Sequence, residues 1–291
     1  FPIDRVHPQR DDAEARAAAA GRDMAAYREF LHAQVRELLT QFGQIDYLFF
    51  DFSYPGDDGK GHEDWDSEGL VRLVRELQPQ VLINDRLDLM DTDWGWDVKT
   101  PEQFMVRDWV RVNGQRVLWE TCQTFSGSWG YHRDESTWKS VGQLTRMLID
   151  TVSKGGNLLL NVGPTARGEF DARALDRLQG MGEWMRRHGR SIYGCTQAPE
   201  GYTTPQDCRL TYNPETNRLY VHVFAWPIRH LHLDGLAGKV AYAQLLNDAS
   251  EVKMVPPRPS HHEAVPEDVL TLELPVVQPD VTVPVIELYL R

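Results

Sequence analysis

Asp51 is the strongest candidate for chemistry in this sequence. It ends an apolar run of β-forming residues, 45–51, which follows a helical pattern and precedes a loop of glycine, proline and aspartate. Such a run is typical of a buried parallel strand. Asp51 would then lie at the carboxyl end of the strand, where ligands bind in α/β folds. The alternative is that Asp51 only caps the following loop.

Further polar side chains are predicted on the same rim: Asn84, Asp85 and Arg86 after the second predicted strand, Glu102 after the loop 94–99, and Glu120 and Asn161 at the ends of the later strands. Several carboxylates among aromatic side chains, with no metal-ligand spacing, indicate acid/base chemistry on a neutral substrate. Glycoside hydrolysis needs one carboxylate as nucleophile and one carboxylic acid that protonates the leaving oxygen. The residue types favour Asp51 as the nucleophile and leave the acid open among Glu102, Asp97, Asp93 and Glu120.

Predicted helices and strands alternate through the first two thirds of the chain. Helices are predicted at 11–42, with a break near Gly21, and at 66–77, 138–153 and 172–187; strands are predicted at 45–51, 81–83, 115–120 and 157–162. This alternation implies a parallel sheet with right-handed crossovers. The sequence therefore predicts an α/β fold, a partial (β/α)8 (TIM-like) barrel of about four βα units in residues 1–195.

From residue 196 the pattern changes to short β-type runs separated by proline, asparagine and glycine. The runs lie at 218–224, 240–246, 269–274 and 285–290. This spacing is typical of an all-β sandwich, so residues 196–291 are predicted to form a second, accessory domain. A packing role is favoured for this domain, and carbohydrate contact is the alternative.

Composition and charge exclude several classes of partner. The formal net charge of −12 argues against nucleic acid and anionic membranes, which both require a basic face. No apolar run is long enough to span a bilayer, and the N-terminus shows no signal-peptide pattern. The three cysteines are predicted to be buried free thiols, and His261 and His262 to be a solvated pair, so no metal or cofactor is expected.

Two glycine-containing segments in the region 152–163 are predicted to have structural roles. Gly155 and Gly156 precede a strand instead of joining a strand to a helix, so they predict a turn and not a phosphate-binding loop. Asn161 and Gly163, at the far end of that strand, predict a tight, glycine-requiring approach to the pocket floor.

Two motifs resemble the family 29 glycoside hydrolases, which are retaining α-L-fucosidases. The first contains WETC at 119–122 and SWGY at 128–131; the second is VSKGGNLLLNVGPT at 152–165, followed by Gly168-Glu169. The resemblance covers residues 11–193 well and the β-rich tail in general character. It implies a retaining exo-α-L-fucosidase that removes terminal α-L-fucosyl residues from fucosylated oligosaccharides or glycoconjugates by double displacement.

The resemblance also implies catalytic roles. Asp51 matches the family's nucleophile, although Phe49 stands where tryptophan is common and Phe52 where glycine often follows. The segment Lys99-Thr-Pro-Glu102 is similar to a loop that carries the acid/base in some members, which makes Glu102 the expected acid/base.

Four residues are expected to bind the substrate. Arg86 resembles an arginine that binds sugar oxygens, and Trp129 resembles an aromatic residue that packs on the fucose C6 methyl group. The alternatives are a structural ion pair for Arg86 and a core position for Trp129. Phe49 and Trp96 complete the set.

The predicted barrel is incomplete, because a whole one takes about 250 residues. The resemblance implies that the N-terminal part of the catalytic barrel is lacking. Exposed edge strands would favour aggregation, so a homo-oligomer that covers the open barrel edge is predicted. The alternative functions are a weakly active or inactive sugar-binding or assembly module, derived from this family by N-terminal truncation, and a retaining hydrolase for another neutral sugar.

Overall fold

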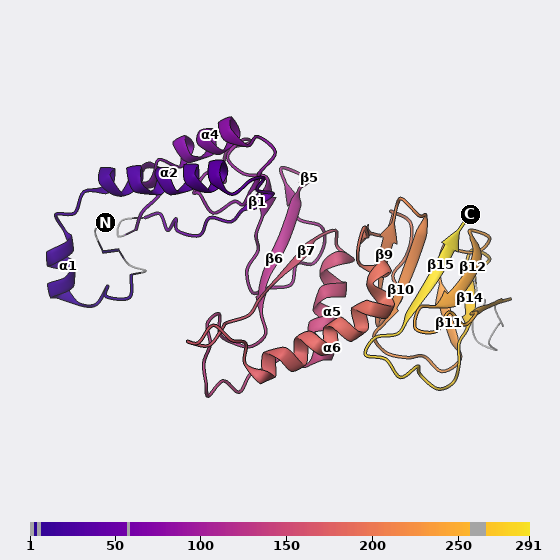
Figure 1. The fold of residues 1–291 in the computed structure, drawn as a ribbon. Coiled ribbons are helices and arrows are strands. Elements are labelled where there is room, and N and C mark those ends of the chain that lie inside the picture. Colours follow the sequence, from indigo (N-terminus) through magenta and orange to yellow (C-terminus); the bar gives the residue numbers. More distant parts are fainter. Residues whose placement is uncertain (1–2, 5–6, 57–58, 257–265) are drawn as a thin grey trace. The chain divides into compact units, whose positions relative to one another are not determined.

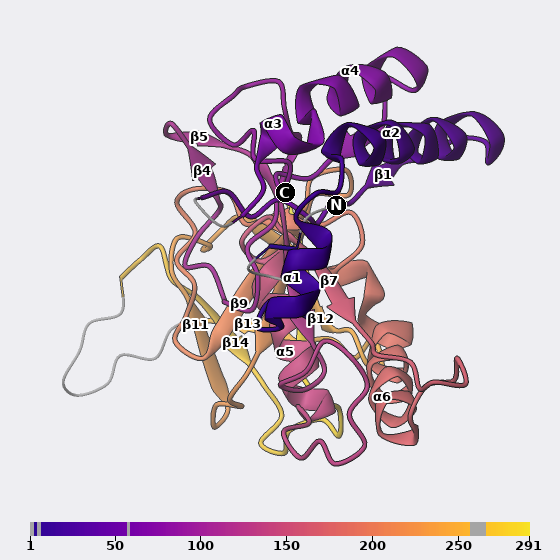
Figure 2. The ribbon, with the colours of Figure 1, turned by 90° about the vertical axis from the view of Figure 1, so that its left-hand side faces the viewer.

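The computed structural model describes residues 3–4, 7–56, 59–256 and 266–291. His261 and His262 lie outside the described residues. The chain divides into two compact units: a first unit of Phe1–Thr100 with Val112–Leu118, and a second unit of Pro101–Arg111 with Trp119–Arg291. Both units combine helices with strands, so the α/β class is as predicted (Figures 1 and 2). The domain boundary at 195/196 stays a prediction.

The first unit holds four helices and four complete short strands among its described residues: α1 (Ala13–Ala19), α2 (Met24–Gln41), β1 (Tyr47–Leu48), α3 (His62–Trp65), α4 (Ser67–Leu77), β2 (Leu82–Ile83), β3 (Val98–Lys99) and β5 (Gln115–Arg116). Aspartates begin the longer helices, since the side chains of Asp12, Asp23 and Asp66 accept hydrogen bonds from first-turn amides. The predicted break near Gly21 is confirmed by the gap between α1 and α2. Strands β1 and β2 pair in parallel, with Tyr47 opposite Leu82.

The core of the first unit lies between α2, α4 and β2. Helix α4 contributes Leu70 and Val74, helix α2 contributes Leu39, and strand β2 contributes Ile83. The apolar residues of α4 recur at helical spacing, so they share one face and are removed from water together. This core fixes the strands whose ends carry Asp51 and Arg86.

The second unit begins with a parallel strand pair and two helices: β6 (Leu118–Thr124), α5 (Val141–Val152), β7 (Asn157–Asn161) and α6 (Ala172–His188). Strand β4 (Arg111–Val112) has one residue in each unit. Ser140 and Gln143 form a capping box, which starts α5 later than the predicted residue 138. Gly155 has a φ of 74° in the turn before β7, which confirms the turn predicted there.

The rest of the second unit is antiparallel β-sheet: β8 (Thr196–Gln197), β9 (Cys208–Asn213), β10 (Arg218–Val223), β11 (His230–Leu233), β12 (Val240–Leu245), β13 (Lys253–Val255), β14 (Leu270–Glu273) and β15 (Val285–Leu290). One sheet has the order β12-β15-β10-β9-β8 and the other β11-β14-β13. Residues of both sheets share one apolar core, including Leu219, Leu233, Leu272 and Ile286. The four predicted β-runs are confirmed as β10, β12, β14 and β15.

Helices α5 and α6 pack against the five-stranded sheet (Figure 1). Ile149 of α5 and Trp184 of α6 share an apolar cluster with Tyr220 and Val285 of the sheet. The indole of Trp184 also donates a hydrogen bond of 2.9 Å to the carbonyl of Val283. The helices of the predicted catalytic part and the strands of the predicted accessory part therefore stabilise each other.

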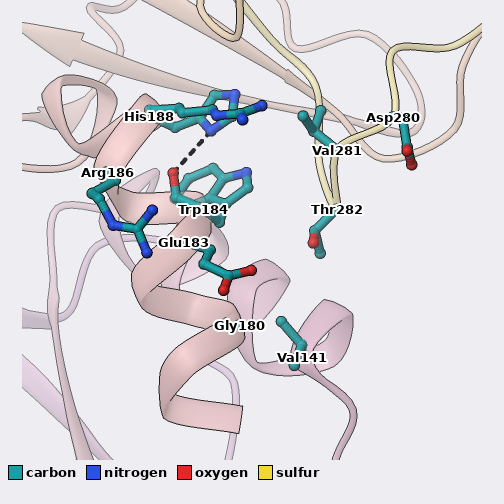
Figure 3. A pocket seen from close by; sticks show the side chains of 10 residues that line it. Val141, Gly180, Glu183, Trp184, Arg186, His188, Asp280, Val281 and Thr282 are labelled. Carbon is teal, nitrogen blue, oxygen red and sulfur yellow. Dashed lines mark hydrogen bonds between the residues drawn. The ribbon is translucent and has the colours of Figure 1, made fainter. Parts of the chain in front are cut away.

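Two histidines are buried where α6 meets this sheet. His188 Nδ1 lies 2.9 Å from the Trp184 carbonyl, and its ring stacks on Trp184 beside a pocket of about 620 Å³ (Figure 3). His222 Nε2 lies 2.9 Å from Thr211 Oγ1. Among the described residues, neither His188 Nε2 nor His222 Nδ1 has a hydrogen-bond partner. Burial lowers the pKa of both imidazoles, that of His222 to about 3 with a contribution from His188.

We therefore expect the second unit to lose stability as the pH falls below about 6.5. The folded form holds His222 neutral, whereas the unfolded chain binds a proton there between pH 6.5 and 3. From pH 6.5 to 5 the free energy of unfolding should drop by about 2 kcal/mol for this site. Urea unfolding at both pH values measures the effect.

The control is the variant His222→Leu, which removes the titrating group from the same buried position. Its free energy of unfolding should change less between the two pH values than that of the wild type. An equal pH dependence in both proteins would contradict the assignment to His222.

The cysteines are free thiols. Cys122 and Cys208 are buried as predicted, but Cys195 is half-buried, since its position beside the short strand β8 is less covered. Burial raises the pKa of Cys208 to about 11, so this thiol is unreactive at neutral pH. No helix within the described ranges has the length and hydrophobicity to cross a membrane.

Candidate active site

The backbone around Asp51 departs from the strand before the carboxylate is reached. Regular pairing of β1 with β2 ends at Leu48, not at Asp51 as predicted. At Phe50 the side chain of Asn84 takes the place of a partner strand: it accepts from the Phe50 amide at 2.9 Å and donates to the Phe50 carbonyl at 2.7 Å. Asp51 therefore stands beyond the carboxyl end of β1, in the segment that Asn84 holds, with its side chain half exposed.

Arg86 forms an ion pair with Asp51. Its Nη1 donates to Asp51 Oδ1 at 3.0 Å, and its side chain is mostly buried while that of Asp51 is 51% exposed. The other carboxylate oxygen, Oδ2, accepts no hydrogen bond from any residue that the structure describes. The arginine thus orients the carboxylate and leaves one oxygen open.

Asp85 and Thr100 in turn orient Arg86. Thr100 donates its amide and its hydroxyl to Asp85 Oδ1, at 3.1 and 2.6 Å. The Thr100 hydroxyl oxygen accepts from Arg86 Nε at 3.0 Å, and the Thr100 carbonyl accepts from Nη2 at 3.3 Å. Sequence reasoning missed Thr100, because its role depends on the side chains that the fold brings to it.

The two aromatic residues predicted on this rim have different surroundings. Phe49 is 37% exposed and lies under the Arg86 guanidinium, which is 5.1 Å from the ring centroid. The ammonium of Lys99 covers one face of Trp96 at 4.0 Å, and the indole N–H of Trp96 donates to the Thr92 carbonyl. Trp96 therefore has one ring face for stacking at most.

Asp97 and Asp93, two acid candidates in the first unit, differ in the contacts that their carboxylates make. Asp97 Oδ2 accepts from Arg75 at 2.6 Å and from the Ile83 amide at 2.7 Å, so this carboxylate is used to hold strand β2. Asp93 is exposed in the loop before β3. The contacts of Asp97 argue against a role as the acid, whereas Asp93 stays a candidate.

Glu102 is held by strand β6 of the second unit. It forms an isolated parallel bridge with Cys122, whose amide donates to Pro101 at 3.0 Å and whose carbonyl accepts from Gln103 at 2.9 Å. Gln103 has a φ of 58° and donates its side chain to Thr124 at 3.0 Å. The backbone on both sides of Glu102 is therefore anchored, and the exposed side chain projects from a fixed point.

Glu120 does not lie at the same strand end as Asn161, and this part of the predicted cluster is wrong. In the parallel pair β6/β7, Glu120 is opposite Asn157 and Asn161 is opposite Thr124. Four residues of strand separate the two levels by about 13 Å. Strand β6 continues past the predicted end at 120, because its pairing with β7 extends to Thr124. Glu120 therefore lies at the opposite end of this strand pair from Asn161.

The carboxyl end of β7 supports the loop that carries Trp129. Asn161 Nδ2 donates to the Trp129 carbonyl at 2.6 Å, and the Trp129 residue is 41% exposed, so a core position is not observed. A Cβ on Gly163 would lie 2.5 Å from the Gly130 carbonyl carbon and the Tyr131 nitrogen. The need for glycine at 163 is confirmed, but the close neighbour is the backbone of this loop and a pocket floor is not shown.

Gly163→Ala should displace the Trp129 loop and destabilise the protein. The new methyl group would meet backbone that has to shift, and overpacking of this kind costs about 1–3 kcal/mol. Urea unfolding measures the loss. In the control variant Gly182→Ala, on helix α6, the methyl group meets nothing within 4 Å, so stability should stay equal or rise. Equal effects of the two changes would contradict the close approach.

The family model for alpha-L-fucosidase matches residues 4–190, which is more than half of the chain. The chain belongs to the alpha-L-fucosidase family. Both family motifs seen in the sequence lie inside the matched residues, and the resemblance is confirmed.

Relatives in the alpha-L-fucosidase family show how much of the fold is shared. Alpha-L-fucosidase isoenzyme 1 from Paenibacillus thiaminolyticus is 39% identical with a TM-score of 0.85, over 99% of this chain and 67% of that chain. A Thermotoga maritima alpha-fucosidase, solved in complex with a mechanism based inhibitor, is 26% identical with a TM-score of 0.67, over 91% and 57%.

The plasma alpha-L-fucosidase of Homo sapiens is 31% identical over 182 residues, which are 59% of this chain and 38% of the human protein. The chain thus spans about two fifths of the length of this curated relative.

Proposed function

We propose that this chain is a retaining exo-α-L-fucosidase that hydrolyses terminal α-L-fucosyl residues of oligosaccharides or glycoconjugates by double displacement. The observation that supports this most is Asp51: a carboxylate at the end of a parallel strand, oriented by Arg86 at 3.0 Å and open at Oδ2. Membership of the alpha-L-fucosidase family and the printed names of the relatives support the substrate.

In the proposed first step Asp51 is the nucleophile. Its Oδ2 forms an ester bond to the anomeric carbon of the fucosyl group, and the bond from that carbon to the aglycone oxygen breaks. The electron pair stays on the aglycone oxygen, which takes the proton of the Glu102 carboxyl group. This step requires the two carboxyl groups to be about 5–5.5 Å apart in the active enzyme.

In the proposed second step Glu102 acts as the base. It removes a proton from water, and the water oxygen forms a bond to the anomeric carbon while the ester bond to Asp51 breaks. The Asp51 carboxylate and the protonated Glu102 are thereby regenerated. Two inversions at the same carbon leave its configuration unchanged.

The substrate-binding residues follow the same proposal. Arg86 donates to fucosyl oxygens as well as to Asp51, and Phe49 supports its guanidinium from below. Trp129 packs on the C6 methyl group, since its ring is exposed on a loop held by Asn161. The uncovered face of Trp96 borders the sugar or its aglycone.

We further propose that the parallel strands belong to a partial (β/α)8 barrel and that residues 196–291 form a β-sandwich. The parallel pairs β1/β2 and β6/β7, each with an intervening helix, support the barrel. Strand β1 ends beside exposed Phe49, and Leu82 of β2 is also exposed, so a homo-oligomer that covers this edge is the proposed assembly. A monomeric mass by light scattering at assay concentration would contradict it.

A panel of aryl glycosides tests the proposed activity. An aryl α-L-fucoside should be hydrolysed, and NMR should show α-L-fucose as the first product because configuration is retained. Faster hydrolysis of another aryl glycoside than of the aryl α-L-fucoside would show that the preferred substrate carries a sugar other than fucose. Binding of fucose without turnover would favour the sugar-binding module.

A further inference from the structure

We infer that Asn84 is the positioning residue for the attacking carboxylate; the inference rests on the proposed function. The carboxamide of Asn84 contacts both polar groups of the Phe50 backbone, with its oxygen 2.9 Å from the amide nitrogen and its nitrogen 2.7 Å from the carbonyl oxygen. Phe50 immediately precedes Asp51. The two hydrogen bonds therefore fix the backbone from which the nucleophile projects.

The two hydrogen bonds between the Asn84 carboxamide and the Phe50 backbone, called the clamp below, replace strand pairing at the point where pairing ends. Backbone pairing of β1 with β2 stops at Leu48 and Ile83, and without Asn84 the segment 49–51 would be held by the ion pair of Asp51 with Arg86 and by side-chain packing. Asn84 is itself fully buried and its backbone forms a parallel bridge with Val98. Because the planar carboxamide bonds both the amide and the carbonyl of Phe50, the backbone dihedral angles of Phe50 can change little without breaking one of these hydrogen bonds.

The clamp and Arg86 act on different parts of the nucleophile. Asn84 holds the main chain before Asp51, whereas Arg86 holds carboxylate oxygen Oδ1. With both in place, Oδ2 is the atom left to move toward the anomeric carbon. A displacement of about 1 Å at a reacting atom can lower the rate by about 10²-fold. The structure thus assigns a rate effect to Asn84, although this side chain touches no substrate.

Gln78 provides a matched control at the other end of the same segment. Its side chain accepts from the Ile45 amide at 2.9 Å and donates to the carbonyls of Leu39 and Gly43 at 2.7 and 2.9 Å. It therefore also ties backbone near β1 through a carboxamide, but six residues before Asp51. Loss of Gln78 should affect stability without moving the nucleophile.

The experiment compares Asn84→Leu and Gln78→Leu with the wild type, using an aryl α-L-fucoside. We expect Asn84→Leu to lower kcat by about 10²-fold, with the inhibition constant of fucose changed less than threefold. Gln78→Leu should lose stability toward urea but keep kcat within threefold of the wild type. Equal kcat losses in the two variants, or wild-type kcat in Asn84→Leu, would overturn the inference.

Asn84→Asp covers the case in which the leucine variant does not fold. A neutral carboxylic acid has the donor and acceptor pattern of the carboxamide, whereas a carboxylate repels the Phe50 carbonyl. The ratio of the Asn84→Asp kcat to the wild-type kcat should therefore rise as the pH falls. A ratio that does not change with pH would overturn the inference. No turnover by the wild type contradicts the proposed function instead, whereas turnover with unaffected Asn84 variants contradicts this inference alone.

Discussion

Replacing Asp51 by asparagine is expected to lower kcat for an aryl α-L-fucoside by roughly 10⁴-fold or more, as happens when a covalent nucleophile is lost. The carboxamide oxygen can still accept from Arg86 Nη1, now 3.0 Å from Asp51 Oδ1, so the local fold should persist. An amide cannot supply the negative oxygen that forms the ester. Initial rates of aryl release measure the loss, and circular dichroism checks the fold.

Asp46→Asn is the matched control for this change. Asp46 lies in the same segment, is exposed, and its carboxylate accepts a hydrogen bond from Gln44 at 3.0 Å. Its kcat should stay within twofold of the wild type. More than a tenth of wild-type kcat in Asp51→Asn would remove Asp51 from the nucleophile role.

Asp51→Ala provides a second measurement, because it leaves space for an external anion. Added azide should then restore release of the aryl group and give a fucosyl azide of inverted configuration, since a single displacement inverts the anomeric carbon. If azide restored aryl release without forming a fucosyl azide, this would argue against direct attack by azide from the position of the Asp51 carboxylate.

Replacing Glu102 by glutamine is expected to lower kcat/KM by roughly 10²- to 10⁴-fold for substrates with poor leaving groups, such as fucosylated oligosaccharides. A 2,4-dinitrophenyl α-L-fucoside should lose far less, because its phenolate leaves without a proton. The backbone beside Glu102 is tied to Cys122 at 3.0 and 2.9 Å, so glutamine should occupy the same position. The ratio of the two losses measures the acid role.

Glu215→Gln is the control for a general loss of negative charge, since Glu215 is exposed in the turn between β9 and β10. Both substrates should be hydrolysed at wild-type rates. Equal losses for the two leaving groups in Glu102→Gln would show that Glu102 is not the acid, and the unengaged Asp93 would become the next candidate.

Local signals predicted the helices well. Asp23, Asp171 and the Ser140-x-x-Gln143 box each satisfy amides of a first turn, and helices α2, α6 and α5 begin directly after them. These interactions join residues close in sequence, so their effect can be inferred from the sequence. The strands β8, β9, β11 and β13 were not predicted, because they depend on partners elsewhere in the chain.

In the candidate site, too, some features could be inferred from the local sequence and others depend on partners elsewhere in the chain. Asp51 and Arg86 were placed at strand ends from apolar runs that end on polar residues, and the ion pair between them shows that the two side chains lie together. The ion pair is also the alternative named for Arg86, so its sugar-binding role stays a prediction. Glu120 also follows an apolar run, but pairing with Asn157 places it at the other strand end from Asn161. A run of β-forming residues shows that a strand exists, whereas its neighbour decides where pairing stops.

The sequence by itself determined the family, the alternation of helices and strands, and the aspartate after the first apolar run. The tertiary structure alone decided that Asn84 clamps Phe50, that Thr100 orients Arg86, and that Gly163 meets the Trp129 loop. Composition and periodicity depend on neighbours along the chain. These contacts join residues 14 to 34 positions apart, so folding had to bring them together before their roles existed.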